Sequence, residues 1–136
     1  MLQKMRVLLL VCITAVLAAC GGGDGGSDAT PNFAGNYRIN ANLATNSCNL
    51  AGLVQVVGGV DTVTQSGRNV TYSSEGINPL QGTVDADNGG YTVTGSQTSS
   101  GVTFALTAKY KASTAYEMRL VANGCTIVYI GTATKI

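Results

Sequence analysis

The chain has 136 residues, enough for a single domain, and it combines 45% hydrophobic residues with only 11% charged ones. It contains no His, the commonest general base and metal ligand, which excludes the commonest forms of acid–base catalysis and zinc binding. The formal charge of +1 argues against nucleic-acid binding, which needs a basic face, and the low charge content argues against a disordered chain.

The N-terminus has the features of an export signal. Lys4 and Arg6 give it a positive charge, and an apolar run at 7–17 follows directly. That run is too short to span a bilayer comfortably, but it is typical of the hydrophobic part of a signal peptide.

The apolar run ends in Leu17-Ala18-Ala19-Cys20, which resembles the lipobox of bacterial lipoproteins. The resemblance implies that residues 1–19 are a cleaved signal peptide and that Cys20 is lipidated, which makes the membrane a partner. Two or three acyl chains hold a protein stably at a bilayer. Gly21 stands where inner-membrane lipoproteins of enterobacteria have Asp, so the resemblance implies the outer membrane, on its periplasmic side or at the cell surface. The alternative is an ordinary secretory signal whose cleavage site happens to precede a Cys.

The resemblance also implies a role for each of the four cysteines. Cys12 leaves with the signal and Cys20 carries lipid, so Cys48 and Cys125 remain. Because an exported chain reaches an oxidising compartment, we expect these two to form a disulfide. A reactive thiol pair is the alternative, although it lacks a CxxC spacing and a nearby His.

The rest of the chain divides into a tether and a β domain. Residues 20–32 hold the lipidated Cys and a flexible Gly-rich tether, and residues 33–136 form the domain. Polar and apolar residues alternate strictly at 36–43 and 102–111, as in strands with one buried and one solvated face. A helical turn at 50–57 is left open. We expect strands at 35–43, 53–66, 69–74, 80–87, 90–96, 101–111, 115–122 and 125–135.

Two dipeptides predict hairpins. Asn88-Gly89 is the strongest two-residue hairpin signal, and it pairs Asp87 with Gly90. The pairing that follows sets Ala86 opposite Tyr91 and Val84 opposite Val93. Asn123-Gly124 predicts a second such hairpin, with the pairs Ala122–Cys125, Leu120–Ile127 and Met118–Tyr129.

Two further turns follow from residue type and from strand parity. Parity means that alternate residues of a strand point inward and outward, so that paired residues must share a face. Gly67-Arg68 suits a type II′ turn that pairs Val63 with Tyr72. A three-residue loop at 112–114 sets Lys109 against Glu117 on the solvent face, where we expect an ion pair. Gly58-Gly59 is expected to bend its long strand as a bulge.

Eight consecutive strands with short loops either expose two long edges or close into a barrel. A Cys48–Cys125 disulfide favours closure, because the end of the first strand lies beside the start of the last strand in such a barrel. We therefore predict an all-β fold, an eight-stranded antiparallel up-and-down barrel closed by the first and last strands. In pattern, residues 33–136 resemble the small lipocalin-like meander barrels of bacterial lipoproteins.

This topology sorts the loops into two ends. The turns at 67–68, 88–89 and 112–114 lie with both termini at the membrane-facing end. The longer connections at 44–52, 75–79 and 97–100 lie at the opposite end, with the 123–124 turn and the disulfide. Because binding residues concentrate on loops carried by a rigid scaffold, we expect recognition at this far end.

The tyrosines are the candidate lining of the barrel interior. All six have inward parity in the expected strands: Tyr37, Tyr72, Tyr91, Tyr110, Tyr116 and Tyr129. They either line a lumen that holds a small amphipathic ligand or fill the core, with their hydroxyls reaching solvent at the barrel mouth.

Catalytic and metal chemistry find little support. The segment 85–90 superficially resembles a calcium loop, but Gly89 stands where that loop needs an oxygen ligand and Ser96 stands where it needs an acid. Asp85 and Asp87 are expected on the solvent face, and in general we expect the acids of this chain to face water. No Ser has a His base. We therefore expect no enzyme, no metal and no cofactor.

Together these features predict a lipid-anchored, non-enzymatic envelope protein whose small barrel is a binding or accessory module, with an envelope protein as a candidate partner. One alternative is a carrier of a small hydrophobic ligand in the lumen, which requires a cavity above roughly 300 Å³. Another is an inhibitor of proteases or lysozymes.

Overall fold

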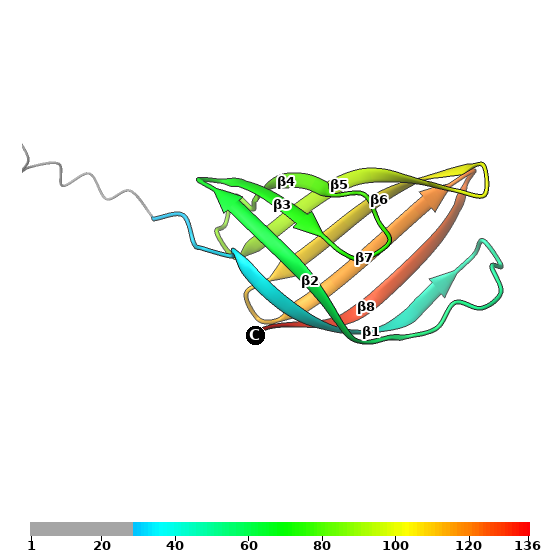
Figure 1. The fold of residues 1–136 in the computed structure, drawn as a ribbon, viewed down its shortest axis with the longest axis horizontal. Helices are drawn as coiled ribbons and strands as arrows, with labels where there is room; N and C mark the ends of the chain where they lie inside the picture. The colour runs from blue at the N-terminus through cyan, green and yellow to red at the C-terminus, as the bar shows by residue number, and fades with distance from the viewer. Residues whose placement is uncertain (1–28) are drawn as a thin grey trace, which may run out of the picture.

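The computed structural model describes residues 29–136, which form a closed barrel of eight antiparallel strands (Figure 1). This confirms the predicted fold class, including closure by pairing of the first and last strands. The signal peptide, Cys20 and most of the tether lie outside the described residues. The strands are β1 (Gly35–Asn46), β2 (Val56–Ser66), β3 (Asn69–Ser73), β4 (Leu80–Val84), β5 (Gly90–Ser99), β6 (Val102–Lys111), β7 (Ala115–Ala122) and β8 (Cys125–Lys135).

Alternating residue size and polarity explains why these segments form a barrel wall. In β1 the side chains of Tyr37, Ile39 and Ala41 are buried, while the intervening Arg38 and Asn40 are exposed. Because successive side chains of a strand point to opposite faces, one face fills the interior and the other meets solvent. Within residues 29–136 there is no helix of the length and apolar character that a membrane crossing requires.

Two predicted turns have the predicted register. Val63 lies opposite Tyr72 across the 67–68 turn. Across the 123–124 turn, Leu120 lies opposite Ile127 and Met118 opposite Tyr129. Apolar residues of paired strands therefore share the inner face at both places.

The predicted bulge is present in β2. Ile39 pairs with Gly59 and Asn40 pairs with Val57, so Gly58 has no partner on β1. Gly58 adopts a φ of 69°, a left-handed conformation that suits glycine, and its N–H donates to Asn40 Oδ1 at 2.9 Å. The bulge changes the parity of the strand, so that Val56 faces the barrel interior with Gly59 and Asp61.

The predicted register of the β4–β5 hairpin is wrong by two residues. Val84 lies opposite Tyr91, and Gly82 lies opposite Val93. The connection is a five-residue loop at 85–89, closed by the Asp85 N–H donating to the Gly90 carbonyl at 2.9 Å. β4 therefore ends at Val84, before the predicted pair of Ala86 with Tyr91 and that of Asp87 with Gly90 can form.

The neighbouring hairpin explains this difference. The Arg68 guanidinium donates to the carbonyls of Val84 and Asp85 at 2.9 and 2.6 Å, and to Asn88 Oδ1 at 2.8 Å. These three hydrogen bonds stabilise the five-residue loop at 85–89, so the two-residue turn predicted at 88–89 does not form. A shift of two residues keeps every side chain on its predicted face.

The distal connections also differ from prediction. β5 and β6 extend to a two-residue turn at Ser100-Gly101, where both φ angles are positive, so the longer connection expected at 97–100 is absent. Positive φ at both central positions is the geometry of a type I′ hairpin turn, and Ser-Gly supplied a weaker signal for it than Asn-Gly. β1 extends to Asn46, β2 begins only at Val56, and residues 50–57 form turns and the start of β2 without a helix.

The predicted disulfide joins Cys48 to Cys125, with a Cα–Cα distance of 4.9 Å. It ties the β1–β2 loop to the first residue of β8, beside the seam where β1 and β8 pair. Ser47 and Thr126 add three hydrogen bonds at the same place, at 3.1, 2.8 and 2.9 Å. The closure of the barrel is therefore covalent at this end.

The barrel has two distinct ends (Figure 1). The described chain ends and the turns at 67–68, 85–89 and 112–114 lie at one end, called here the tether end. The β1–β2 loop, the β5–β6 hairpin and the 123–124 turn lie at the other, called the distal end.

Candidate functional site

Aromatic side chains fill the interior at the tether end. The Phe33 ring packs edge-on against Tyr91 and Tyr110, with centroid distances of 5.7 and 5.8 Å. Tyr110 also packs against Tyr37 at 5.2 Å and stacks on Tyr91 at 5.4 Å. All four residues are buried, so this half of the lumen is solid.

Phe33 closes the barrel interior at the tether end, where hydrogen bonds hold its backbone in place. Its N–H donates to Gln65 Oε1, and Gln65 Nε2 donates to the Pro31 carbonyl, both at 2.8 Å. The Tyr37 hydroxyl donates to the Phe33 carbonyl at 2.7 Å. Burial and the neighbouring Tyr110 raise the pKa of Tyr37 to about 12, so this donor keeps its proton at physiological pH.

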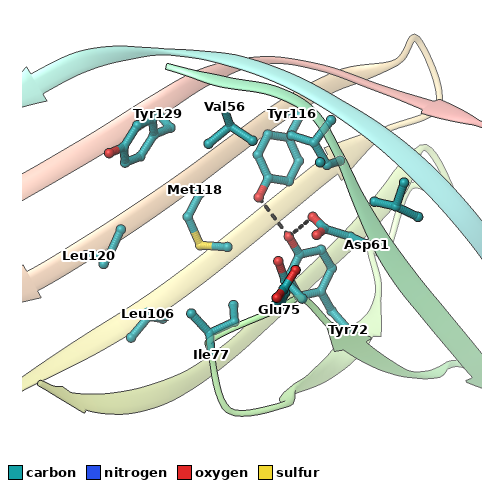
Figure 2. A pocket seen from close by; sticks show the side chains of 14 residues that line it. Val56, Asp61, Tyr72, Glu75, Ile77, Leu106, Tyr116, Met118, Leu120 and Tyr129 are labelled. Atoms are coloured by element: carbon teal, nitrogen blue, oxygen red, sulfur yellow. Dashed lines mark hydrogen bonds between the residues drawn. The ribbon is translucent and has the colours of Figure 1, made fainter. Parts of the chain in front are cut away.

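The distal half contains a cavity of about 380 Å³. One wall comes from β6, β7 and β8, and the other from β2 and the β3–β4 loop (Figure 2). Most of the lining is apolar, and polar groups gather at one side. The lining residues are Ile39, Val56, Gly59, Val60, Asp61, Tyr72, Ser74, Glu75, Ile77, Leu106, Tyr116, Met118, Leu120 and Tyr129.

The polar side of the cavity is a chain of three groups centred on Tyr72 (Figure 2). The Tyr72 hydroxyl donates to Asp61 Oδ2, and the Tyr116 hydroxyl lies 2.9 Å from the Tyr72 hydroxyl. A phenol has one proton, and Tyr72 uses it on the carboxylate, so Tyr116 donates to Tyr72 when Asp61 is ionised. The three groups thus form a directional network that ends on Asp61.

Asp61 is a buried carboxylate, with only 5% of its surface exposed. Burial raises its pKa above the ordinary value of about 3.9, and the hydroxyls of Ser74 and Tyr72 partly counteract that rise. Burial, together with the neighbouring Tyr116 and Asp61, raises the pKa of Tyr72 far above the physiological range. Tyr72 is therefore a permanent hydrogen-bond donor to Asp61.

Positive charge is confined to the outside of the barrel. The six Lys and Arg side chains of the described region are all exposed, and none lines the cavity: Arg38, Arg68, Lys109, Lys111, Arg119 and Lys135. A second acid, the exposed Glu75, lines the cavity from the β3–β4 loop. The cavity therefore carries two carboxylates and no protein cation.

The structure divides the six predicted lining tyrosines between the two halves. Tyr72, Tyr116 and Tyr129 line the cavity, whereas Tyr37, Tyr91 and Tyr110 belong to the solid tether half. Three of the six predicted residues therefore line the cavity, and the other three pack in the core.

The expectation that the acids face water is wrong for Asp61. A signal for its position was present, because the 67–68 turn places Val63 on the inner face and Asp61 shares its parity. The other expected acids are outside. Asp85 and Asp87 lie near Lys111 Nζ, at 2.6 and 3.8 Å. Lys109 lies opposite Glu117 as predicted, but the ion pairs found within residues 29–136 are those of Lys111.

The part of the chain that the structure describes contains no group of three His, Cys, Asp or Glu side chains that could hold a metal ion.

No protein-family model, curated protein or solved structure matches this chain. The resemblances to lipoproteins and to lipocalin-like barrels therefore stay predictions from the sequence. The function is inferred from the geometry of the cavity.

Proposed function

We propose that this chain is a lipid-anchored, non-enzymatic binding protein of the bacterial envelope that holds a small amphipathic molecule in the distal half of its barrel. The observation that carries this proposal is the cavity of about 380 Å³. Ligand sites are typically concave, mostly apolar and about 300–1,000 Å³ in volume, with a few placed polar groups that orient the ligand. The apolar walls and the Asp61–Tyr72–Tyr116 network have this composition.

The placement of the cavity supports the same proposal. A lipid at Cys20 would attach the protein through its solid tether end, so the cavity would face away from that membrane. The apolar wall residues Leu106, Met118 and Leu120 come from paired strands of the rigid barrel. A pocket on a rigid scaffold binds without a large cost for ordering its walls.

The polar groups are suited to binding more than to reaction. Each proton of the Tyr116–Tyr72–Asp61 network is already donated to the next member, and the pKa values of both phenols are raised by burial. General acid–base catalysis works best with groups that titrate near the working pH. Two phenols that hold their protons act as fixed donors.

Native mass spectrometry of the mature, lipidated protein tests this function. We expect a small molecule to copurify with the protein and to be absent from Leu120→Trp, because the larger side chain fills the cavity. Thr94→Trp is the matched control, since Thr94 is exposed on β5 and does not line the cavity. Loss of the ligand from both variants, or equal retention in both, would contradict binding in the lumen. Circular dichroism on each variant shows whether the barrel is folded.

A further inference from the structure

The buried carboxylate of Asp61 lacks a countercharge. Its partners are the neutral hydroxyls of Tyr72 and Ser74, and each Lys and Arg within residues 29–136 is exposed on the outside of the barrel. Burying a charge costs several kcal/mol unless an opposite charge and hydrogen bonds compensate it. Two neutral hydrogen bonds compensate only part of this cost, so the site is electrostatically incomplete without a cation.

The second carboxylate of the cavity, that of Glu75, adds to this excess of negative charge. Glu75 is exposed and lines the same cavity from the β3–β4 loop. An anionic ligand would therefore meet like charge both at the rim and at the buried polar side. A neutral ligand would leave the Asp61 charge uncompensated. A cation would be attracted by both acids, because apolar walls lower the local dielectric and strengthen the interaction.

The opposite wall constrains the rest of the ligand. In Figure 2 Leu106, Met118 and Leu120 lie across the hollow from the Asp61 carboxylate and the two phenol hydroxyls. A ligand that fills this space needs one charged end and one apolar body. A small inorganic cation would leave the apolar wall uncovered.

We propose that the ligand is a cationic amphiphile, an amine with an apolar chain or ring, whose charged nitrogen pairs with Asp61 and whose apolar part packs against the wall formed by β6 and β7. This inference rests on the proposed function and specifies its ligand class. The ammonium would donate to the carboxylate oxygens of Asp61, while Tyr72 and Tyr116 hold that carboxylate in position. Glu75 would favour entry of positive charge at the rim.

A matched series of probes tests the charge of the ligand separately from binding itself. Hexylamine, hexanol and hexanoate share one apolar chain and differ only at the head group. Their binding is measured by calorimetry on the mature lipidated protein in nanodiscs, with empty nanodiscs subtracted. We expect hexylamine to bind at least tenfold more tightly than hexanol, about 1.4 kcal/mol, and hexanoate to bind most weakly.

The variant Asp61→Asn sharpens the test. It has nearly the same shape and still accepts a hydrogen bond from Tyr72, but it carries no charge. We expect hexylamine and hexanol to bind it with affinities within about twofold of each other, and retained hexanol binding shows that the pocket is intact. Asp85→Asn is the matched control, since Asp85 lies at the tether end beside Lys111, and it should keep the full preference for the amine.

The outcomes distinguish the two proposals. If hexanol or hexanoate binds the unaltered protein as tightly as hexylamine does, the inference of a cationic ligand is overturned and binding in the lumen stands. If Asp61→Asn keeps the preference for the amine, Asp61 is not the pairing group and the inference is also overturned. If no probe binds and no molecule copurifies, both proposals are overturned.

Discussion

The two halves of this barrel are built by the same eight strands and yet have opposite interiors. At the tether end Phe33, Tyr37, Tyr91 and Tyr110 pack ring against ring and leave no lumen. At the distal end the same wall encloses about 380 Å³. An eight-stranded barrel is just wide enough to be filled by side chains or to hold one small ligand, and here both occur in one molecule.

Strand length contributes to the difference. β3 and β4 have five residues each, whereas β5 and β6 have ten. Beyond the end of β3 the wall continues as a loop, whose Ser74, Glu75 and Ile77 line the cavity. A strand places a side chain inside at every second residue, so short strands supply fewer side chains to fill the distal interior. The filled half supports the fold, and the hollow half is free to bind.

The largest expected effect concerns how the hollow half is closed. Replacing Cys48 and Cys125 by Ser removes a crosslink across 77 residues. The chain-entropy model gives a loss of about 4.5 kcal/mol in the free energy of unfolding for a loop of this length. Urea unfolding of the double variant against the oxidised protein measures it. A loss below about 1 kcal/mol would mean that packing alone closes the distal end.

The next largest effect is the loss in the free energy of unfolding when a tyrosine is truncated to alanine, compared between the two halves of the barrel. Tyr91 is buried in the aromatic stack, so Tyr91→Ala should lower the free energy of unfolding by about 3–5 kcal/mol. Tyr129 is only partly buried and lines the cavity, so Tyr129→Ala should cost less than half as much. Urea unfolding of both variants makes the comparison. Equal losses would show that the halves do not differ in packing.

The smallest expected effect is a gain in stability at Asp61. Because burial raises the pKa of Asp61, the folded protein binds this proton more tightly than the unfolded chain does. Its contribution to stability is therefore present at low pH and is lost as the pH rises from about 3.9 through the folded pKa. Asp61→Asn lacks this loss, and we expect it to be more stable than the unaltered protein at neutral pH, by less than either loss described above.

The pH dependence provides the control for that gain. The advantage of Asp61→Asn should shrink as the pH falls through the folded pKa of Asp61, because the unaltered protein then also becomes neutral at this position. Thermal unfolding of both proteins between pH 4 and 8 measures the difference. A variant that is less stable at pH 7 would show that the buried carboxylate supports the fold. A stabilised variant that loses amine binding would show a residue kept for function at the expense of stability.

Much of the fold was predictable because a strand has a period of two and short turns have distinctive residues. Parity alone places Val63, Tyr72, Met118 and Tyr129 inside, and the two remaining cysteines indicate the seam. The β4–β5 register was not predictable, because it depends on Arg68 reaching from another hairpin to the Val84 and Asp85 carbonyls.

The candidate site was predictable only in part. The inward position of Asp61 follows from its parity with Val63. The cavity does not follow from any local pattern, because it depends on the summed volumes of side chains from many strands and on where β3 ends. Tyr116 and Tyr91 have the same inward parity, yet one lines the cavity and the other fills the core.

The position of the disulfide has a kinetic consequence. Cys48 and Cys125 join the β1–β2 loop to β8 beside the β1–β8 seam, so these strands cannot separate at the distal end while the bond is intact. The β3–β4 loop is held by hydrogen bonds to β5, from the Asn78 N–H to Gln97 at 2.9 Å and from the Asn78 amide to the Ser96 carbonyl at 3.1 Å, and by packing of Ile77 against the core. The distal end thus has one side closed by a covalent bond and one side held by non-covalent contacts, so we expect exchange of any occupant to be limited by opening of the second side.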